Sequence, residues 1–189
     1  MLATGHNQSR ALDLYAWNIQ ISEAFFPILC ASEIALRDRI ADRLRIQFGD
    51  TWWESSPFLT QIQRGKSKVL TARDNLAKRD RLTSGRMIAE LTFGFWVNMT
   101  LPRHEAKFWR GFHTHFKHLP KDITYDDFHN RCRHIGDLRN RIFHHEPIFG
   151  RDLTADYSKT LQLIAWLNPD KAAWIKPYSR VMYVLRQKP

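Results

Sequence analysis

The chain has 189 residues, of which 43% are hydrophobic and 13% aromatic, so it can bury the core of one domain and is too apolar to be disordered. Its 29 Lys and Arg against 19 Asp and Glu give a formal net charge of +10, which favours polyanionic partners, nucleic acid before an anionic membrane. The longest apolar run, residues 24–31, is interrupted by Pro27 and is too short to span a bilayer. The first ten residues are polar, so we expect a cytoplasmic protein with no membrane segment.

The first part of the chain predicts a tail followed by helices. We expect residues 1–8 to be a flexible tail and residues 9–189 to form a single helical domain. Apolar residues recur at helical spacing up to Phe26, and a second apolar stripe runs to Leu44. Pro27 lies between the two stripes, so the sequence predicts a kink or a restart of the helix there.

The next segment contains two charged residues that we expect to be paired, and other residues along the chain are expected to be buried or at an interface. Glu33 and Arg37 fall inside the second apolar stripe, where a charge is costly unless it is paired, and their spacing of four predicts that they pair with each other. The alternative is that they orient the helix that carries the motif described below. Trp52 and Trp53 are neighbours in a connector, so one of them is expected at an interface. Both cysteines, Cys30 and Cys132, are expected to be buried thiols.

Residues 60–82 predict a polar, basic helix. Between Arg64 and Arg86, eight Lys and Arg stand against two Asp. Such a face is by default only solvated, but the net charge makes it a candidate for contact with the RNA backbone. The candidate RNA-binding residues are Arg64, Lys66, Lys68, Arg73, Lys78, Arg79 and Arg81.

The rest of the chain also reads as helical. Residues 87–101 are the most apolar and predict a central buried helix, in which Phe93, Phe95 and Trp96 are core residues. Further helices are predicted over residues 102–116, after residues 122–127, and over residues 153–167, 172–175 and 181–186. No alternating strand pattern and no repeat occurs, so we predict an all-α fold, a single helical bundle.

Residues 138–149 read Leu-Arg-Asn-Arg-Ile-Phe-His-His-Glu-Pro-Ile-Phe. Ile135, Leu138 and Ile142 recur at helical spacing, and Pro147 cannot continue a helix, so the segment forms the last turns of one.

Four polar positions of this segment form two pairs. Asn140 and His144 are four apart, as are Arg141 and His145, so each pair shares a face. Because a helix C-terminus favours a protonated imidazole, proton transfer beside an arginine is chemically reasonable here.

The spacing between Arg139 and His144 carries little information, because Arg110 and His115 repeat it. What distinguishes the first pair is its context, namely Asn140 directly after the arginine, the second histidine and Pro147. His113, His115 and His118 lack the spacing of a metal site on one helical face, so we expect no metal.

Residues 139–148 resemble the signature of the Abi-like (AbiD/AbiF-type) abortive infection proteins, a branch of the HEPN superfamily whose mark is Arg-polar-x-x-x-His on a late helix. Other segments resemble that family in the same order, so the resemblance covers nearly the whole chain. These segments are residues 14–18, 33–37, 52–53, 90–96 and 166–169.

This resemblance implies a metal-independent endoribonuclease without a cofactor, acting as a toxin-type effector of phage defence. It implies a homodimer with the two motif helices facing each other. His144 would be the general acid or base, Arg139 would stabilise charge on the phosphorane, and Asn140 would orient either the histidine or the phosphate. His145 could share or replace the role of His144, and Arg141 could be the phosphate contact.

The expected partners are RNA, a second copy of the chain and an antitoxin, either protein or RNA. Two other functions stay open at this stage. One is a catalytically silent HEPN module that binds RNA, and the other is an interaction protein that senses a phage component.

Overall fold

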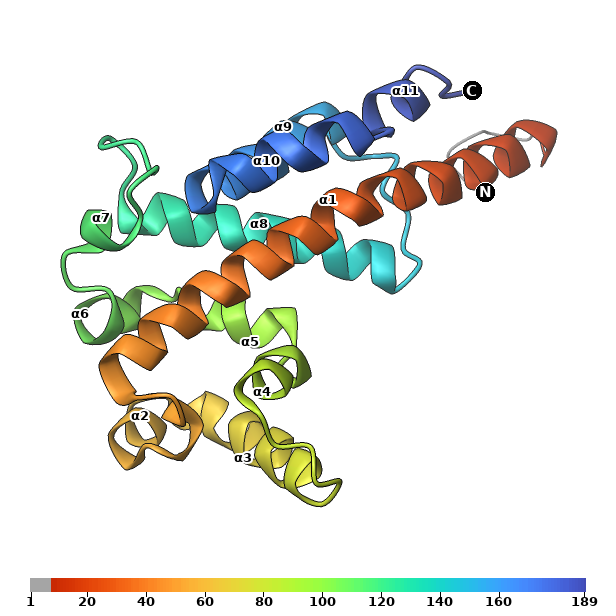
Figure 1. Ribbon diagram of the computed structural model, residues 1–189. Coiled ribbons are helices and arrows are strands. Elements are labelled where there is room, and N and C mark those ends of the chain that lie inside the picture. Colours follow the sequence, from red (N-terminus) through yellow and green to blue (C-terminus); the bar gives the residue numbers. More distant parts are fainter. Residues whose placement is uncertain (1–7) are drawn as a thin grey trace. The chain divides into compact units, whose positions relative to one another are not determined.

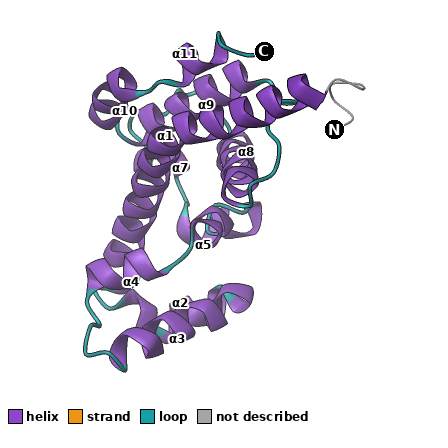
Figure 2. Cartoon of the chain, turned by 90° about the vertical axis from the view of Figure 1, so that its right-hand side faces the viewer, coloured by secondary structure: helices purple, strands orange, loops and turns teal. Residues whose placement is uncertain are grey.

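The computed structural model describes residues 8–189 of the chain (Figure 1). These residues form eleven α-helices and three 3₁₀ helices and contain no strand (Figure 2). The predicted all-α class is therefore confirmed. Of the predicted tail, residues 1–7 lie outside the described residues, and Gln8 already belongs to the first helix.

Helix α1 (Gln8–Phe48) runs for 41 residues and continues through Pro27. The predicted restart is therefore wrong. An interior proline costs a helix about 3 kcal/mol because it removes one hydrogen bond, but Phe25, Ile28 and Leu29 around it are almost fully buried, and their burial offsets that cost. An 18-residue window of α1 has a mean hydropathy of 1.4, enough by composition to cross a bilayer, but half of it is buried inside the protein, so it is weak evidence for a membrane span.

By its internal contacts the chain divides into two compact units. We call residues 8–32 and 134–189 the terminal unit and residues 33–133 the central unit. Helix α1 and helix α8 (Tyr125–Phe143) contribute residues to both. A division by contacts does not measure independent folding, so the single domain over residues 9–189 stays a prediction.

The terminal unit adds three α-helices and one 3₁₀ helix to its parts of α1 and α8. Asp152 accepts a hydrogen bond from the amide of Ala155 at 2.9 Å and so caps the first of these helices, whose observed bounds match the predicted ones. The indole of Trp17 donates to the carbonyl of Val184 at 2.9 Å, which joins α1 to the last helix. The elements are α9 (Leu153–Leu167), α10 (Pro169–Ile175), η4 (Lys176–Tyr178) and α11 (Val181–Leu185).

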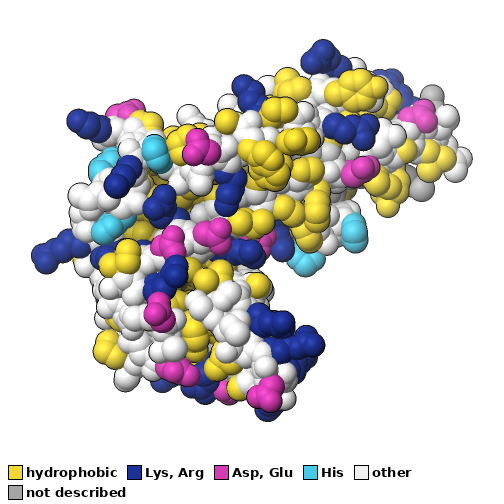
Figure 3. All heavy atoms as spheres, viewed as in Figure 1, with side chains coloured by type: hydrophobic (Ala, Val, Ile, Leu, Met, Phe, Trp, Pro, Cys, Tyr) yellow, Lys and Arg dark blue, Asp and Glu magenta, His cyan; other side chains and the backbone are white. Residues whose placement is uncertain are grey.

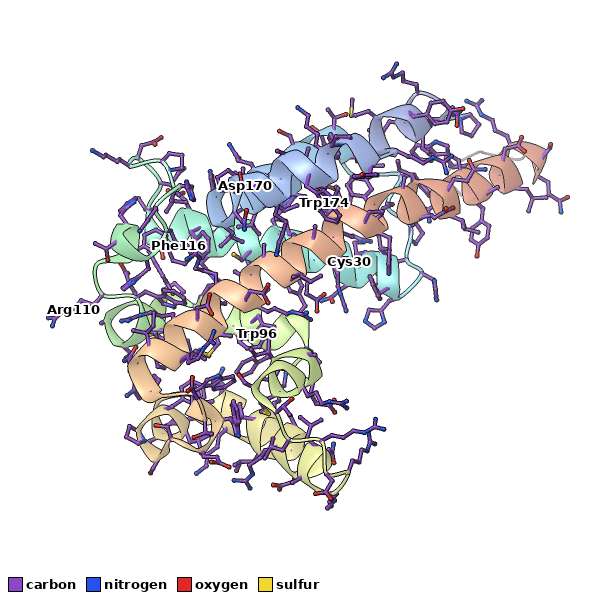
Figure 4. All side chains as sticks on the ribbon, viewed as in Figure 1. Cys30, Trp96, Arg110, Phe116, Asp170 and Trp174 are labelled. Atoms are coloured by element: carbon purple, nitrogen blue, oxygen red, sulfur yellow. The ribbon has the colours of Figure 1, made fainter. Side chains whose placement is uncertain are left out.

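The central unit is built from short helices around aromatic side chains. Trp52 packs edge-on against Phe58, with ring centroids 5.3 Å apart, and against Trp96, at 6.2 Å. Figure 4 labels Trp96 and Phe116, two buried rings of this unit. Its elements, besides its parts of α1 and α8, are η2 (Trp52–Glu54), α2 (Ser56–Gln61), α3 (Gln63–Ala77), α4 (Ser84–Glu90), α5 (Phe93–Asn98), η3 (Pro102–His104), α6 (Glu105–Phe108) and α7 (Phe112–His115).

Three expectations for this part of the chain need correction. Trp52 and Trp53 are both buried, so neither is at the surface; in a 3₁₀ helix neighbours differ by only about 120°, and Trp53 packs edge-on against Trp52 itself. The predicted helix over residues 87–101 is divided into α4 and α5, and Thr92 caps α5 by accepting from the Phe95 amide.

The predicted helix over residues 102–116 is also divided, into η3, α6 and α7. Gly111, between α6 and α7, has φ +72°, which only glycine adopts without strain. Neither Cys30 nor Cys132 forms a disulfide; Cys132 is buried, but Cys30 is only half-buried, so its predicted burial is wrong.

Candidate active site

Helix α8 carries the motif, and local hydrogen bonds define where it begins. Thr124 precedes it and donates from its amide and its hydroxyl to Oδ2 of Asp127, at 3.0 and 2.6 Å. The Asp127 amide donates back to the Thr124 hydroxyl at 3.1 Å. This reciprocal arrangement is a capping box. It lowers the pKa of the Asp127 carboxyl.

The other end of α8 closes at the two histidines. The amide of His145 donates to the carbonyl of Ile142 at 3.1 Å, and the amide of Glu146 donates to that of Arg141 at 2.8 Å. This pair of bonds is a Schellman motif, in which the residue in the position of His145 adopts the left-handed conformation. Its φ is indeed +58°. Glycine usually occupies that position, because an L-side chain there costs about 1–2 kcal/mol.

The motif residues lie on different sides of this helix end. Five residues correspond to about 140° of rotation, so Arg139 and His144 diverge. The guanidinium of Arg139 lies 4.0 Å from the centroid of the Phe143 ring, and that ring stacks on Phe26 of α1 at 5.6 Å. Asn140 and His144 are both exposed, one turn apart, and the His144 amide donates to the Asn140 carbonyl at 2.9 Å.

Arg141 is engaged within its own segment. Its Nε lies 3.3 Å from Oε2 of Glu146, and both side chains are exposed. The same two residues are also joined by a backbone hydrogen bond of the Schellman motif, from the Glu146 amide to the Arg141 carbonyl. As a phosphate contact, Arg141 would have to exchange this carboxylate for the ligand.

Beside the helix end lies a groove of about 830 Å³ formed by α1 and α8. Of the two motif histidines, His145 lines it. Its wall includes Tyr15, Ile19 and Phe26, whose side chains are 61%, 54% and 48% exposed, although they are large and apolar. Figure 3 shows hydrophobic side chains at the surface of this unit and histidines near the end of α8. The full lining comprises Tyr15, Asn18, Ile19, Ser22, Glu23, Phe26, Pro27, Ile142, Phe143 and His145.

The loop after α8 is fixed by two residues that sequence reasoning missed. The side chain of Asn18, on α1, accepts a hydrogen bond from the amide of Ile148 at 2.8 Å, in a buried position. Ile148 itself is fully buried. Asn18 also lines the groove. The sequence does contain a sign of this role, because Asn18 is a polar residue on the buried face of an apolar helix. The expected pairing of Glu33 with Arg37 rests on the same kind of observation.

The second missed anchor is Asp156, a buried carboxylate on α9. Arg151, at the end of the same loop, donates from Nε to Oδ2 at 2.7 Å and from Nη2 to Oδ1 at 3.0 Å. Nε2 of His134, on α8, lies 2.5 Å from Oδ1. The hydrogen bond with Asp156 raises the pKa of Arg151. The loop that carries the histidines is thus tied to α1, α8 and α9.

A second hollow, of about 340 Å³, is formed by α1 with η4 and α11 and shares Glu23 and Pro27 with the groove. Its exposed wall carries Tyr178 and Tyr183 together with Arg180. Trp174, labelled in Figure 4, lies 5.9 Å from the ring of Tyr178. Exposed aromatic rings beside a cation are the usual elements of a surface that stacks nucleic-acid bases.

The remaining candidates lie in the central unit. Arg37 makes an ion pair with Asp38 at 3.6 Å, and the predicted pairing of Glu33 with Arg37, like their orienting role, stays a prediction. The basic residues of α3 and its following loop are mostly exposed, and Lys and Arg side chains gather there in Figure 3. Arg73 is half-buried and pairs with Asp74 at 2.7 Å.

In residues 8–189, no group of three or more His, Cys, Asp or Glu side chains is arranged to hold a metal ion. A search against protein-family models found no match for this chain, and searches of curated proteins and of solved structures found none either. The resemblance to Abi-like HEPN proteins therefore stays a prediction from the sequence.

Proposed function

We propose that this chain is a HEPN-type endoribonuclease that cleaves RNA without a metal ion. The observation that supports the proposal is the end of α8, where Arg139 and His144 lie on different sides of the helix and the strained His145 lines a large groove. Strained backbone in a non-glycine residue persists only where its surroundings enforce it, and such residues cluster at functional sites. Here the loop anchors Asn18 and Asp156 supply that enforcement.

The proposed reaction is an internal phosphoryl transfer. The ribose 2′-oxygen attacks phosphorus, its proton passes to an imidazole nitrogen, and the bond from phosphorus to the 5′-oxygen breaks. A second imidazolium protonates the leaving oxygen, which leaves a 2′,3′-cyclic phosphate and a 5′-hydroxyl. Arg139 stabilises the negative charge on the non-bridging oxygens. His144 is the principal acid or base, and His145, at the groove, is the second candidate.

The site is completed by a second copy of the chain. Arg139 and His144 diverge around their helix, so in the proposed dimer each active site combines Arg139 of one chain with His144 of the other. The exposed residues Leu12, Tyr15, Ile19 and Phe26 follow spacings of three, four and seven along α1, the pattern of a helix-to-helix seam. Large exposed apolar surfaces of this kind mark interaction sites. The seam and the groove together form the proposed dimer face.

The cellular role proposed from the sequence resemblance is that of a toxin-type effector in phage defence, in the cytoplasm, held inactive by a protein or RNA antitoxin. One observation favours a second candidate, a catalytically silent RNA-binding HEPN module. The guanidinium of Arg139 is held against the Phe143 ring, about 140° around the helix from His144, and a guanidinium held there does not contact a phosphate beside His144 of the same chain.

The test is cleavage of total RNA in EDTA by the wild type, His144→Ala and His145→Gly, followed by analysis of the 3′ ends. Arg110→Gln is the control, because Arg110 is exposed on the α6–α7 loop (Figure 4). Arg110 and His115 repeat the spacing of Arg139 and His144 outside the proposed site. We expect cyclic-phosphate ends from the wild type and the control, and loss of cutting in His144→Ala. Equal cutting by all four proteins would overturn the proposal, and RNA binding without cutting would favour the silent module.

The composite site has its own test. Arg139→Ala and His144→Ala chains are each expected to be inactive, but mixing them should restore cutting, because a mixed dimer has one site with both residues intact. If each site used both residues of a single chain, mixing would restore nothing.

A further inference from the structure

The central unit contains a basic pocket of about 340 Å³ between α3, α5 and η3. This volume lies at the lower end of the range for small-molecule sites. A smaller hollow of about 280 Å³ adjoins it and shares four lining residues with it, among them Arg64, Arg103 and His104. We call the two hollows together the basic pocket. No acidic side chain lines either of them.

Four cations surround the basic pocket. Arg64 and Lys68 lie one turn apart on α3, and Arg103 and Lys107 lie one turn apart along η3 and α6. Within residues 8–189, none of the four forms an ion pair with a carboxylate. Like charges that converge without a counter-charge repel one another, and an anion placed between them removes that cost.

The wall of the basic pocket also contains an unsatisfied buried group. His104 is only 5% exposed, and its Nδ1 is buried without a hydrogen-bond partner. Its ring packs against Phe108 at 5.3 Å, so its position is fixed by the core. A buried polar atom without a partner costs roughly 1–3 kcal/mol, and native proteins keep few of them. Because His104 lines the basic pocket, a ligand oxygen that reached Nδ1 from there would satisfy it.

Helices α3 and α5 approach each other closely at Gly65. A Cβ at Gly65 would lie 3.4 Å from the Phe95 ring, at the near limit of ordinary van der Waals contact. Asn98, on α5, adds an amide to the lining. The basic pocket therefore offers cations at its rim, and a neutral imidazole and an amide at its wall, a donor set suited to phosphate oxygens.

We infer that the basic pocket binds a phosphate group, carried either by a free nucleotide or by the end of an RNA chain. The inference reaches beyond the proposed ribonuclease and does not require it. It also assigns Arg64 and Lys68, two of the expected RNA-binding residues, to a defined pocket with Arg103, His104 and Lys107 rather than to a diffuse basic face.

The experiment is calorimetric titration of the full chain with three kinds of probe. These are adenosine 5′-monophosphate, inorganic phosphate, and short oligonucleotides with a deoxyribose backbone, which lack the 2′-OH needed for cleavage. The oligonucleotides are used with and without a 5′-phosphate. Arg103→Gln is the test variant and Arg110→Gln the charge-matched control, since Arg110 lies outside the basic pocket. We expect saturable binding of the phosphorylated probes, roughly tenfold or more weaker in Arg103→Gln and unchanged in Arg110→Gln. Lys68→Gln should repeat the loss if Arg103→Gln folds poorly.

The probes separate the two sources of the phosphate. Equal affinity for the nucleotide and the phosphorylated oligonucleotide means that a free nucleotide makes all the contacts that the basic pocket offers. If the phosphorylated oligonucleotide binds at least about tenfold more tightly than the nucleotide, the ligand is the end of an RNA chain. Either result supports the basic pocket. No saturation at millimolar concentrations, or equal losses in Arg103→Gln and Arg110→Gln, would overturn the inference. Because no probe is cleaved, these outcomes are independent of whether the chain is a nuclease.

Discussion

The guanidinium of Arg139 stacks on the ring of Phe143, one turn later on the same helix, at 4.0 Å from the ring centroid. Phe143 in turn stacks on Phe26. The proposed phosphate-binding arginine is thus held by an aromatic pair that joins α8 to α1. Such a contact orients the guanidinium and contributes about 0.5–1 kcal/mol at a partly exposed site.

Replacing Phe143 should therefore affect both stability and the arginine. For Phe143→Ala we expect a loss of roughly 1–2 kcal/mol, since the ring is 40% exposed and both stacking contacts disappear. Urea denaturation measures it. Phe143→Leu keeps apolar bulk without a π face and should lose less. A loss below about 0.3 kcal/mol in Phe143→Ala would show that the stack contributes nothing.

The left-handed conformation of His145 predicts an unusual result of mutation. His145→Gly removes a side chain yet should raise stability by about 1 kcal/mol, because glycine adopts φ +58° without strain. His145→Ala keeps the strain and loses the imidazole, so it is the matched control and should gain nothing. Thermal melting of the two variants decides between them. A lower melting temperature in His145→Gly than in His145→Ala would show that the imidazole stabilises this turn.

Asp156 should be the most sensitive polar residue of the terminal unit. Asp156→Asn leaves Arg151 without its carboxylate in a mostly buried place, and breaking such pairs costs roughly 3 kcal/mol or more. Hydrogen exchange should also become faster at the Ile148 amide, because the loop loses one anchor. Asp152→Asn is the control, since asparagine caps a helix as well as aspartate does. Unchanged exchange at Ile148 in Asp156→Asn would mean that Asn18 alone holds the loop.

His104 predicts a pH dependence of stability. Burial, aided by Arg103 and Lys107, lowers its pKa to about 4, whereas the unfolded chain binds the proton near 6.5. Between these values the unfolded state holds more protons, so stability is full above about pH 6.5 and is lost as the pH falls toward 4. We expect His104→Leu to reduce this acid loss by roughly 2–3 kcal/mol. Parallel stability curves for the two proteins between these pH values would contradict the assignment.

The sequence predicted helix ends correctly where capping residues and prolines mark them clearly. The cap Asp152 and the pair Asn168-Pro169 bound α9 on both sides, and its limits were predicted correctly. Pro147 placed the end of α8 near the histidines. The segment of residues 87–101 was misjudged because its apolar composition hid Thr92, whose hydroxyl starts a new helix. Pro27 was misjudged because burial on both sides of it outweighs its local cost.

The site was less predictable than the fold. Helix α1 has two apolar faces, and periodicity alone cannot show that Trp17, Ile21 and Phe25 are buried while Tyr15 and Ile19 are exposed. The conformation of His145 depends on the hydrogen bonds that close α8, and no local residue type announces it. Asn18 and Asp156 left a readable signal, a polar residue on a buried helical face, but their partners became known only from the fold.

The bond between Trp17 and Val184 joins residues 167 positions apart. The terminal unit is built from the first and the last segments of the chain, so it cannot assemble while the ribosome is still making residues 134–189. Until residues 142–148 have been made, the groove has no second wall and the Ile148 amide cannot bond to Asn18. A chain that stops before residue 142 therefore lacks one wall of the groove and both motif histidines. For a protein proposed to destroy RNA, this order of synthesis delays the activity until the motif segment has been made.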